Sequence, residues 1–173
     1  LEALADIAKL HLDTMPAIRL AVTGSVGKTT TKEMMACTLS AAYNVQKSLG
    51  NRNNELGMPL TAFSVTKEHN AVIFEMGMRG LGQIAYLAQR VRPKIGVITN
   101  IGTSHIEILG SRENICRAKM ELASYIQPDG VLIVNGDEPL LREACDKSPV
   151  AVKTFGIDTP CDYQAQDIEY LEN

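Results

Sequence analysis

The chain has 173 residues, a length typical of one domain and sufficient to bury a core without disulfide or metal cross-links. With 45% hydrophobic and 21% charged residues, the composition excludes an intrinsically disordered chain. The 17 basic and 20 acidic residues include no basic cluster, so the charge does not indicate a surface for nucleic acid or anionic membranes.

The four cysteines are widely separated and include no C-x-x-C pair, so they predict neither a zinc site nor a disulfide framework. We expect Cys37, Cys116, Cys145 and Cys161 to be small core residues of a protein in a reducing compartment. No segment resembles a signal peptide, and no apolar run approaches the ~20 residues needed to cross a bilayer.

Helical spacing of apolar residues marks the start of the chain, from Leu1 to Leu12. The residues that define this spacing are Leu4, Ile7, Ala8 and Leu10 or Leu12. The pattern predicts a helix that packs on a sheet or links to a preceding domain.

A glycine-rich segment, Thr23 to Thr30, stands between a predicted strand, Ile18 to Val22, and a predicted helix, Thr29 to Tyr43. At such a turn, backbone N–H groups and the helix dipole point at one place, where a phosphate binds. A lysine adds charge at the outer phosphate, and a hydroxyl binds Mg²⁺. Because residue 22 is valine, the first glycine of G-x-x-x-x-G-K-[ST] is displaced to Gly24, so the segment predicts a variant P-loop.

The next segments are assigned from periodicity and composition. Four residues at helical spacing predict the buried face of the helix after the P-loop: Met34, Met35, Thr38 and Leu39. Asn44 to Lys47 predicts a short strand. The segment Leu49 to Pro59 is too polar and glycine-rich for a core, and its composition alone is typical of a turn.

A carboxylate ends the next predicted strand, Ala71 to Gly77. Ligands of parallel sheets gather beyond the carboxyl ends of the strands, so Glu75 is directed at the same edge as the P-loop. This position suits an acid that holds Mg²⁺ directly or through water. The alternative is an ordinary solvated charge at a strand end.

A predicted helix, Leu81 to Val91, leads to a strand, Ile95 to Thr99, which opens into the polar segment Asn100 to Glu107. A lone histidine is more often a hydrogen-bonded bystander than a ligand. His105 becomes a candidate because its strand brings it near Glu75.

Ser111 is predicted to cap the following helix, with Glu113 in its first turn. The expected buried face of this helix is Ile115, Ala118, Leu122 and Ile126. Lys119 lies on the same face. Either its stem covers apolar surface while its ammonium reaches water, or the buried amine loses its proton and becomes reactive.

The rest of the chain continues the alternation of strand and helix. We expect a turn at 128–130, a strand at Val131 to Val134, a polar exit at Asn135 to Pro139, a helix at Pro139 to Asp146, a strand at Val150 to Phe155 and a weak edge strand at Asp162 to Tyr170. The whole pattern predicts a doubly wound, mainly parallel α/β sheet.

In order and spacing, these motifs resemble the Mur ligase family, and the asparagine-rich loop is similar to its MurF-type branch. The motifs are the P-loop from Val22, Gly50-Asn-Arg-Asn-Asn-Glu-Leu-Gly-Met-Pro, Phe74-Glu-Met-Gly-Met, Thr99-Asn, His105-Ile-Glu, Gly110-Ser, Ala118-Lys119 and Val134-Asn-Gly-Asp. The resemblance implies that residues 1–16 are a linker helix from a missing N-terminal domain. It also implies that residues 17–173 are most of a central ATP-binding domain, truncated at its C-terminal side.

The activity implied by the resemblance is ATP-dependent amide ligation. ATP would phosphorylate the terminal carboxylate of UDP-MurNAc-tripeptide, and the amine of D-Ala-D-Ala would attack the acyl phosphate. Such a ligase serves peptidoglycan synthesis, and hence cell wall, cell shape and cell division, in the cytoplasm. Its partners would be these substrates and the flanking domains of its own chain, while nucleic acid and membrane insertion are not expected.

The resemblance also implies roles for individual residues. A phosphate cradle would consist of Gly24, Ser25, Val26, Gly27, Lys28, Thr29 and Thr30, in which Lys28 stabilises the transferred phosphoryl group. Thr29 and Glu75 would hold Mg²⁺. His105 would join Glu75 at a second Mg²⁺, and Lys119 would serve that metal as a carbamate. Contacts to adenosine are implied for Asn135 and Asp137, and contacts on the acyl-phosphate side for Asn51 and Asn54.

Two alternatives stay open. One is another Mur or folylpolyglutamate-type ligase with a different substrate. The other is a non-catalytic nucleotide-binding module, although the guanine-reading N-K-x-D motif of GTPases is absent from the sequence.

Overall fold

The computed structural model describes residues 1–169, which form an α/β structure around a parallel sheet of seven strands. The sheet order is β2-β3-β1-β4-β5-β6-β7, and every pair of neighbours is parallel. The strands are β1 (Ile18–Thr23), β2 (Val45–Lys47), β3 (Ala71–Glu75), β4 (Ile95–Ile98), β5 (Val131–Asn135), β6 (Ala151–Gly156) and β7 (Tyr163–Gln164). The predicted fold class is therefore confirmed.

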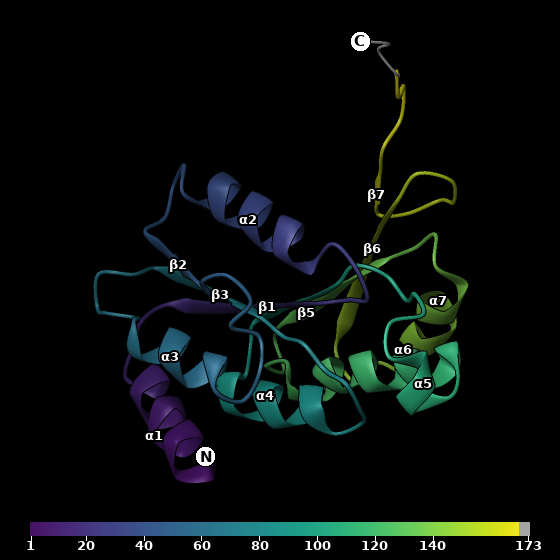
Figure 1. The fold of residues 1–173 in the computed structure, drawn as a ribbon. Coiled ribbons are helices and arrows are strands. Elements are labelled where there is room, and N and C mark those ends of the chain that lie inside the picture. The colour runs from purple at the N-terminus through teal and green to yellow at the C-terminus, as the bar shows by residue number, and fades with distance from the viewer. Residues whose placement is uncertain (170–173) are drawn as a thin grey trace.

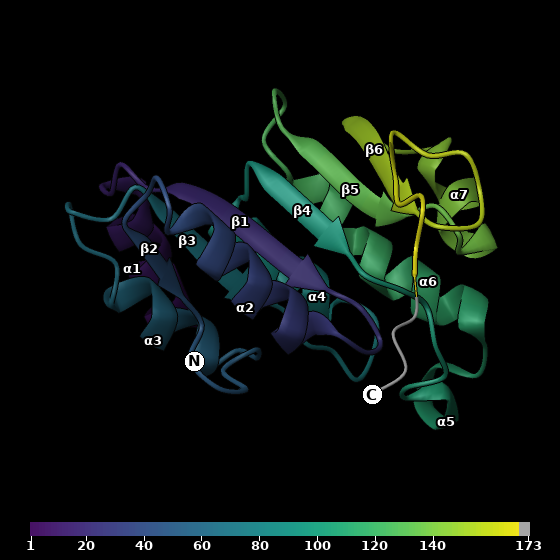
Figure 2. The ribbon, with the colours of Figure 1, turned by 90° about the horizontal axis from the view of Figure 1, so that it is seen from above.

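Helices cover the two faces of the sheet unequally. They are α1 (Glu2–Asp13), α2 (Lys28–Leu39), α3 (Gly57–Phe63), α4 (Gln83–Val91), α5 (Ile106–Leu109), α6 (Arg112–Met120) with the 3₁₀ turn η1 (Glu121–Tyr125), and α7 (Pro139–Cys145). Among the helices of residues 1–169, α2 alone lies on one face, and the others lie on the opposite face (Figure 1). Viewed from above, α2 lies on the side of β2, β3 and β1 and leaves β4, β5 and β6 in plain view (Figure 2).

Because β1 and β3 are covered on both sides, the buried parts of their sequences are continuous apolar runs rather than alternating ones. Successive residues of β1 show the arrangement, since Ala21 belongs to the large core under the sheet and Val22 to the small core beneath α2. All five residues of β3 are buried, including Glu75. This burial fixes the two strand ends that carry the P-loop and Glu75.

The buried face of α1 is only partly the one predicted. Ala8 and Leu12 are buried as expected, but Leu4, Ile7 and Leu10 are exposed and Ala5 is buried instead. The reason is that α1 packs against α3 and α4 through its alanine side, where small side chains allow close approach. Residues 1–16 thus contribute Ala5, Ala8 and Leu12 to the large core under the sheet. That these residues link to a preceding domain stays a prediction.

The predicted apolar face of α2 is only partly right, because Met35 and Leu39 pack against the small core but Met34 and Thr38 do not. Met34 and Thr38 are exposed, Met35 and Leu39 are partly buried, and the fully buried positions are Lys32 and Ala36. The helix also ends at Leu39 rather than Tyr43. The physical reason is that a buried ion pair, described below, turns the Lys32 side of α2 toward the sheet.

Among the cysteines, Cys116 is buried as predicted and Cys145 and Cys161 are intermediate, whereas Cys37 is exposed, so its assignment to the core is wrong. Cys37 follows Ala36 in α2, and only Lys32 and Ala36 of that helix are buried. All four thiols are free, as expected.

Three local assignments also change. The segment predicted as a loop up to Pro59 ends earlier, because α3 begins at Gly57 and its first three residues are buried. The Asn54 side chain supports the start of this helix by accepting hydrogen bonds from the N–H groups of Leu56 and Gly57. The polar segment after β4 turns into α5 at Ile106. The predicted strand from Asp162 forms only β7, and its last residue, Tyr170, lies outside the described residues.

No helix within residues 1–169 combines the length and the apolar character that a membrane span needs.

Candidate nucleotide-binding site

The glycine-rich segment turns from β1 into α2, as the sequence predicts. Gly24 has φ +151° and Gly27, which caps α2, has φ +79°, so both glycines adopt left-handed backbone conformations. The Lys28 ammonium donates hydrogen bonds to the carbonyl oxygens of Gly24 at 2.8 Å and Ser25 at 3.1 Å. Burial lowers the pKa of Lys28, and the Glu75 carboxylate partly offsets this effect. The loop thus carries a lysine at the N-terminus of a helix, the arrangement that binds a phosphate.

Residues after β4 hold the P-loop in place, and the sequence did not identify them as site residues. The Thr99 hydroxyl donates to the Val26 carbonyl at 2.7 Å, while the Asn100 side chain accepts from the Val26 N–H at 3.0 Å. The Ser25 hydroxyl accepts from the Gly102 N–H at 2.8 Å. The available signal was the polar run that begins at Thr99, directly after an apolar strand.

Gly24 and Gly27 differ in what a methyl group would meet. A Cβ at Gly24 would lie 1.9 Å from the Thr99 hydroxyl oxygen, whereas a Cβ at Gly27 would meet no atom within 4 Å among the described residues. We expect Gly27→Ala to lower the free energy of unfolding by about 1 kcal/mol through backbone strain alone. Gly24→Ala adds a steric conflict and the loss of the Thr99 hydrogen bond, at least about 2 kcal/mol more.

Urea unfolding of the two variants measures this difference, with Gly27→Ala as the matched control. Equal losses of stability would show that Thr99 does not constrain the P-loop.

Glu75 lies beside the P-loop, as predicted, because Val22 and Glu75 are paired in the parallel ladder of β1 and β3. Glu75 is 3% exposed, and its carboxylate accepts a hydrogen bond from the Thr29 hydroxyl at 2.9 Å. It also accepts from the Asn53 side chain at 3.0 Å and lies 3.4 Å from the Lys32 ammonium. Asn53 and Lys32 were not predicted as site residues.

The residues present fit a magnesium ion. A hydroxyl and a carboxylate, from Thr29 and Glu75, are the hard oxygen donors that Mg²⁺ prefers. Within residues 1–169, no three His, Cys, Asp or Glu side chains gather closely enough to hold a metal by themselves. A site with one carboxylate and one hydroxyl is nevertheless what Mg²⁺ uses when phosphate oxygens and water complete its coordination.

Lys119 is buried at the inner side of α6. The Ser111 side chain caps this helix by accepting from the Asn114 N–H at 3.2 Å, as predicted. All four residues of the expected apolar face are buried: Ile115, Ala118, Leu122 and Ile126. Lys119 is only 3% exposed, so it does not extend into water. Burial lowers its pKa to about 8, and the Lys28 ammonium contributes to this shift.

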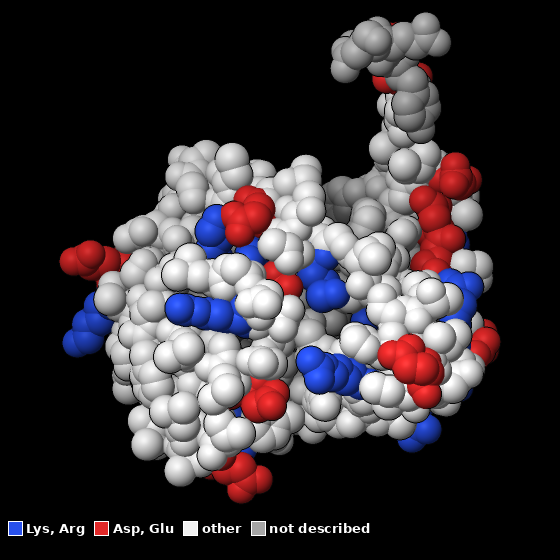
Figure 3. Space-filling model, viewed as in Figure 1, with Lys and Arg blue, Asp and Glu red and all other residues white. Residues whose placement is uncertain are grey.

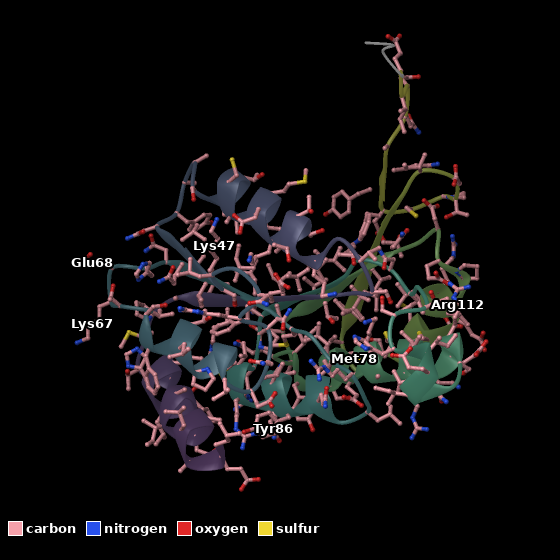
Figure 4. The ribbon with its side chains drawn as sticks, in the orientation of Figure 1. Lys47, Lys67, Glu68, Met78, Tyr86 and Arg112 are labelled. Atoms are coloured by element: carbon pink, nitrogen blue, oxygen red, sulfur yellow. The ribbon has the colours of Figure 1, made fainter. Side chains whose placement is uncertain are left out.

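Part of this site lines a cavity of about 950 Å³, although Thr29 and Glu75 are not among its lining residues. Its lining includes the P-loop residues Gly24 and Lys28, together with His105 and Lys119, so three of the predicted catalytic side chains face one space. Met78 and Tyr86 belong to its wall, beside and on α4 (Figure 4). The space-filling view shows basic side chains around a hollow in the middle of this face (Figure 3).

His105 enters the cavity without reaching Glu75. It caps α5 with φ +64°, its side chain is 38% exposed, and its Nδ1 lies 4.0 Å from a Glu107 oxygen. Among the described residues no hydrogen bond or ion pair joins it to Glu75. Because β1 lies between β3 and β4, the strands that precede Glu75 and His105 are not neighbours.

The two asparagines predicted on the acyl-phosphate side have different surroundings. Asn54 lines the cavity, but its side-chain oxygen accepts from the N–H groups of Leu56 and Gly57 at the start of α3. Asn51 is exposed and does not line the cavity. Between them, Asn53 makes the contact to Glu75 that sequence reasoning missed. Roles for Asn51 and Asn54 toward a substrate stay predictions.

Asn135 and Asp137 shape the sheet edge beyond β5. The Asn135 side chain accepts from the Asp137 N–H at 2.9 Å. The Asp137 carboxylate accepts from the N–H groups of Ile157, Asp158 and Thr159, and the Ile157 bond is the main cause of its lowered pKa. Neither residue lines the cavity, so their contacts to adenosine stay predictions.

Comparison with known proteins decides the family. Residues 22–173 match the family described as the Mur ligase middle domain. The chain belongs to this family. This Mur ligase middle domain is 44% identical, over 172 residues, to UDP-N-acetylmuramoyl-tripeptide–D-alanyl-D-alanine ligase of Bacillus subtilis. The match covers 99% of the chain and 37% of the relative, so the chain spans just over a third of that protein.

Solved structures agree with the family assignment. MurF from Acinetobacter baumannii superposes with a TM-score of 0.92 and 35% identity over 98% of this chain and 37% of that one. MurF ligase from Thermotoga maritima, solved in complex with ADP, has a TM-score of 0.85 and 32% identity over 91% of this chain and 37% of that one.

Proposed function

We propose that this Mur ligase middle domain is the ATP-binding part of a ligase that adds D-Ala-D-Ala to UDP-MurNAc-tripeptide in peptidoglycan synthesis. The observation that carries the proposal is the convergence of the P-loop lysine, Lys28, with the buried Lys119 at one cavity, beside the Thr29–Glu75 pair. The relatives named as MurF ligases, one of them solved with ADP, support the choice of nucleotide and reaction.

In this proposal the chain's residues act mainly by positioning and by neutralising charge. The P-loop, residues 24–30, binds the phosphates of ATP, and the Lys28 ammonium faces the γ-phosphate as it moves to the substrate carboxylate. Thr29 and Glu75 hold Mg²⁺, which when bound neutralises charge on the phosphate oxygens. The product of this step is an acyl phosphate, and attack by the amine of D-Ala-D-Ala forms the amide and releases phosphate.

Lys119 and His105 are assigned to a second Mg²⁺ together with Glu75. Burial favours the unprotonated Lys119 amine, which adds to carbon dioxide with loss of a proton and so becomes a carbamate. The carbamate replaces an ammonium by oxygen donors of the kind that Mg²⁺ binds. Without this change, Lys28 and Lys119 would place two ammonium groups close together in one cavity.

The proposal includes partners that lie outside the described residues. The two substrates would be bound with the help of flanking domains, since the Bacillus subtilis relative is much longer than the matched region. Activity would be located in the cytoplasm and would support cell wall synthesis, cell shape and division. The proposal also includes a carbamate on Lys119 and contacts from Asn135 and Asp137 to the adenosine of ATP.

Product analysis of the complete protein tests the proposed function. With ATP and Mg²⁺, we expect UDP-MurNAc-tripeptide and D-Ala-D-Ala to give the amide product, with ADP and phosphate in equal amounts. Chelation of Mg²⁺ is expected to reduce the rate by at least about 100-fold, because the phosphate charges would lose their counter-ion. Product formation from folate and glutamate instead would favour the folylpolyglutamate alternative, and tight binding of GTP without ligation would favour a nucleotide-binding module.

A further inference from the structure

Lys32 is the largest fully buried side chain of α2, although the sequence gives no reason to expect a buried charge there. Its ammonium has no exposed surface. Taking a lysine ammonium out of water is costly unless acceptors replace the water molecules. The fold therefore retains Lys32 at this position together with a specific set of acceptors.

Those acceptors come from three parts of the chain. The ammonium donates to the Gly50 carbonyl at 3.2 Å, and it lies 3.4 Å from a Glu75 oxygen and 3.3 Å from a Glu33 oxygen. An ammonium has three protons, so these acceptors can satisfy it completely. Glu33 is exposed and is itself paired with Lys47. Of the other two partners, Glu75 is buried, and Gly50 is an exposed residue whose carbonyl accepts from the buried ammonium.

Glu75 and Gly50 belong to two different segments of the candidate site. Glu75 ends β3 next to Thr29 of the P-loop helix. Gly50 is the second residue of the segment 49–56, which we term the asparagine loop. Farther along this loop, Asn53 donates to the second Glu75 oxygen, and its carbonyl accepts from the Gly77 N–H at 2.7 Å. Asn53, Asn54 and Glu55 then form part of the cavity wall.

We propose that Lys32 is a positioning residue that fixes the asparagine loop and the Glu75 carboxylate relative to the P-loop. On the Glu75 side, Lys32 and Thr29 share one oxygen while Asn53 holds the other, so the carboxylate has a single orientation. On the loop side, the Gly50 bond anchors the start of the asparagine loop, and the Asn53 bond anchors the same loop where it reaches the cavity wall. The role of Glu75 toward Mg²⁺ rests on the proposed function, whereas the anchoring of the loop does not.

Trypsin cleavage after Arg52, an exposed residue within the asparagine loop, reports on the anchoring directly. In the complete protein, we expect Lys32→Met to be cleaved there about ten times faster than wild type, because opening of the loop precedes cleavage. Glu33→Gln is the matched control, since it removes only the negative charge of an exposed side chain near Lys32 and should leave the cleavage rate unchanged. Lys32→Arg should restore slow cleavage.

A second readout is the affinity for ATP with and without Mg²⁺. Lys32→Met is expected to weaken binding about tenfold when Mg²⁺ is present and to leave binding unchanged when it is absent, because only the Glu75 geometry is disturbed. If Lys32→Met matches wild type in both cleavage and Mg²⁺-dependent affinity, Lys32 merely balances a buried charge and the inference is overturned. If wild type itself shows no Mg²⁺-dependent ATP binding, the proposed function fails while the cleavage result still decides the role of Lys32.

A pair of variants covers the case in which Lys32→Met does not fold because Glu75 is left buried without its cation. Glu75→Gln keeps the bond from Lys32 to Gly50, and the double variant Lys32→Met with Glu75→Gln removes that bond without leaving a lone charge. Faster cleavage after Arg52 in the double variant than in Glu75→Gln would support the inference. Equal rates in the two would refute it.

Discussion

Replacing Lys28 by alanine is expected to lower the rate of ligation by the complete protein at least about 1000-fold, with a smaller effect on ATP affinity. The lysine emerges from the P-loop at the first residue of α2 and lies over the loop carbonyls, 2.8 Å from that of Gly24. In the proposed reaction its charge is needed most when the γ-phosphoryl group is in transit. An interaction that strengthens in the transition state affects kcat more than binding.

The matched control for this experiment is Lys67→Ala. Lys67 is an exposed lysine in the connection between α3 and β3, far from the cavity (Figure 4), so its loss should leave the rate within about twofold of wild type. Steady-state measurement of ADP release gives kcat and KM for both variants. A normal rate for Lys28→Ala would remove the P-loop lysine from the mechanism and leave the loop as a structural turn.

Replacing Lys119 by alanine is expected to abolish ligation, a loss of at least about 1000-fold, and small carboxylates such as formate or acetate are expected to restore part of it. The reason is that the proposed carbamate supplies oxygen donors to a metal, which a free carboxylate can imitate in the space left by the side chain. The burial of Lys119 favours formation of the carbamate, because it lowers the pKa of the amine. With a pKa of about 8, roughly a tenth of the Lys119 amine is unprotonated at pH 7, against well below 1% for a lysine of ordinary pKa.

Lys119→Arg separates the carbamate from a simple positive charge. Arginine keeps the charge and much of the length but stays protonated and does not react with carbon dioxide. We therefore expect this variant to be inactive as well, and mass spectrometry of the native protein to show a gain of one carbon dioxide at Lys119. Full activity of Lys119→Arg, or of Lys119→Ala without added carboxylate, would contradict the carbamate and leave Lys119 as a packing residue.

Much of the site follows from local sequence. The P-loop could be recognised because its glycines, lysine and hydroxyls occupy consecutive positions between an apolar strand and a helix, and chain connectivity alone brings them together. Glu75 could be placed at the same edge because all strands of a parallel sheet end on one side, and the pairing of β1 with β3 confirms that placement. The cap at Ser111 is equally local, since its partner is the N–H three residues later.

Other features depend on which strands become neighbours, and the sequence does not contain that order in readable form. Thr99 and Asn100 hold the P-loop only because β4 pairs with β1, and His105 is separated from Glu75 because β1 lies between their strands. The expected roles of Asn51, Asn54, Asn135 and Asp137 came from resemblance, and their direct partners in the structure are mostly backbone groups of nearby loops.

The sequence by itself determined the parallel α/β fold, the P-loop and the acid that faces it, because each depends on the order of residues along a strand and the turn that follows. Only the tertiary structure decided that Lys32 is buried against the sheet while Met34 is exposed, and that Lys119 is buried beside Lys28. Helical periodicity shows which residues share a face. It does not show that the Glu75 carboxylate and the Gly50 carbonyl, from distant segments, lie next to that face and accept protons from the Lys32 ammonium.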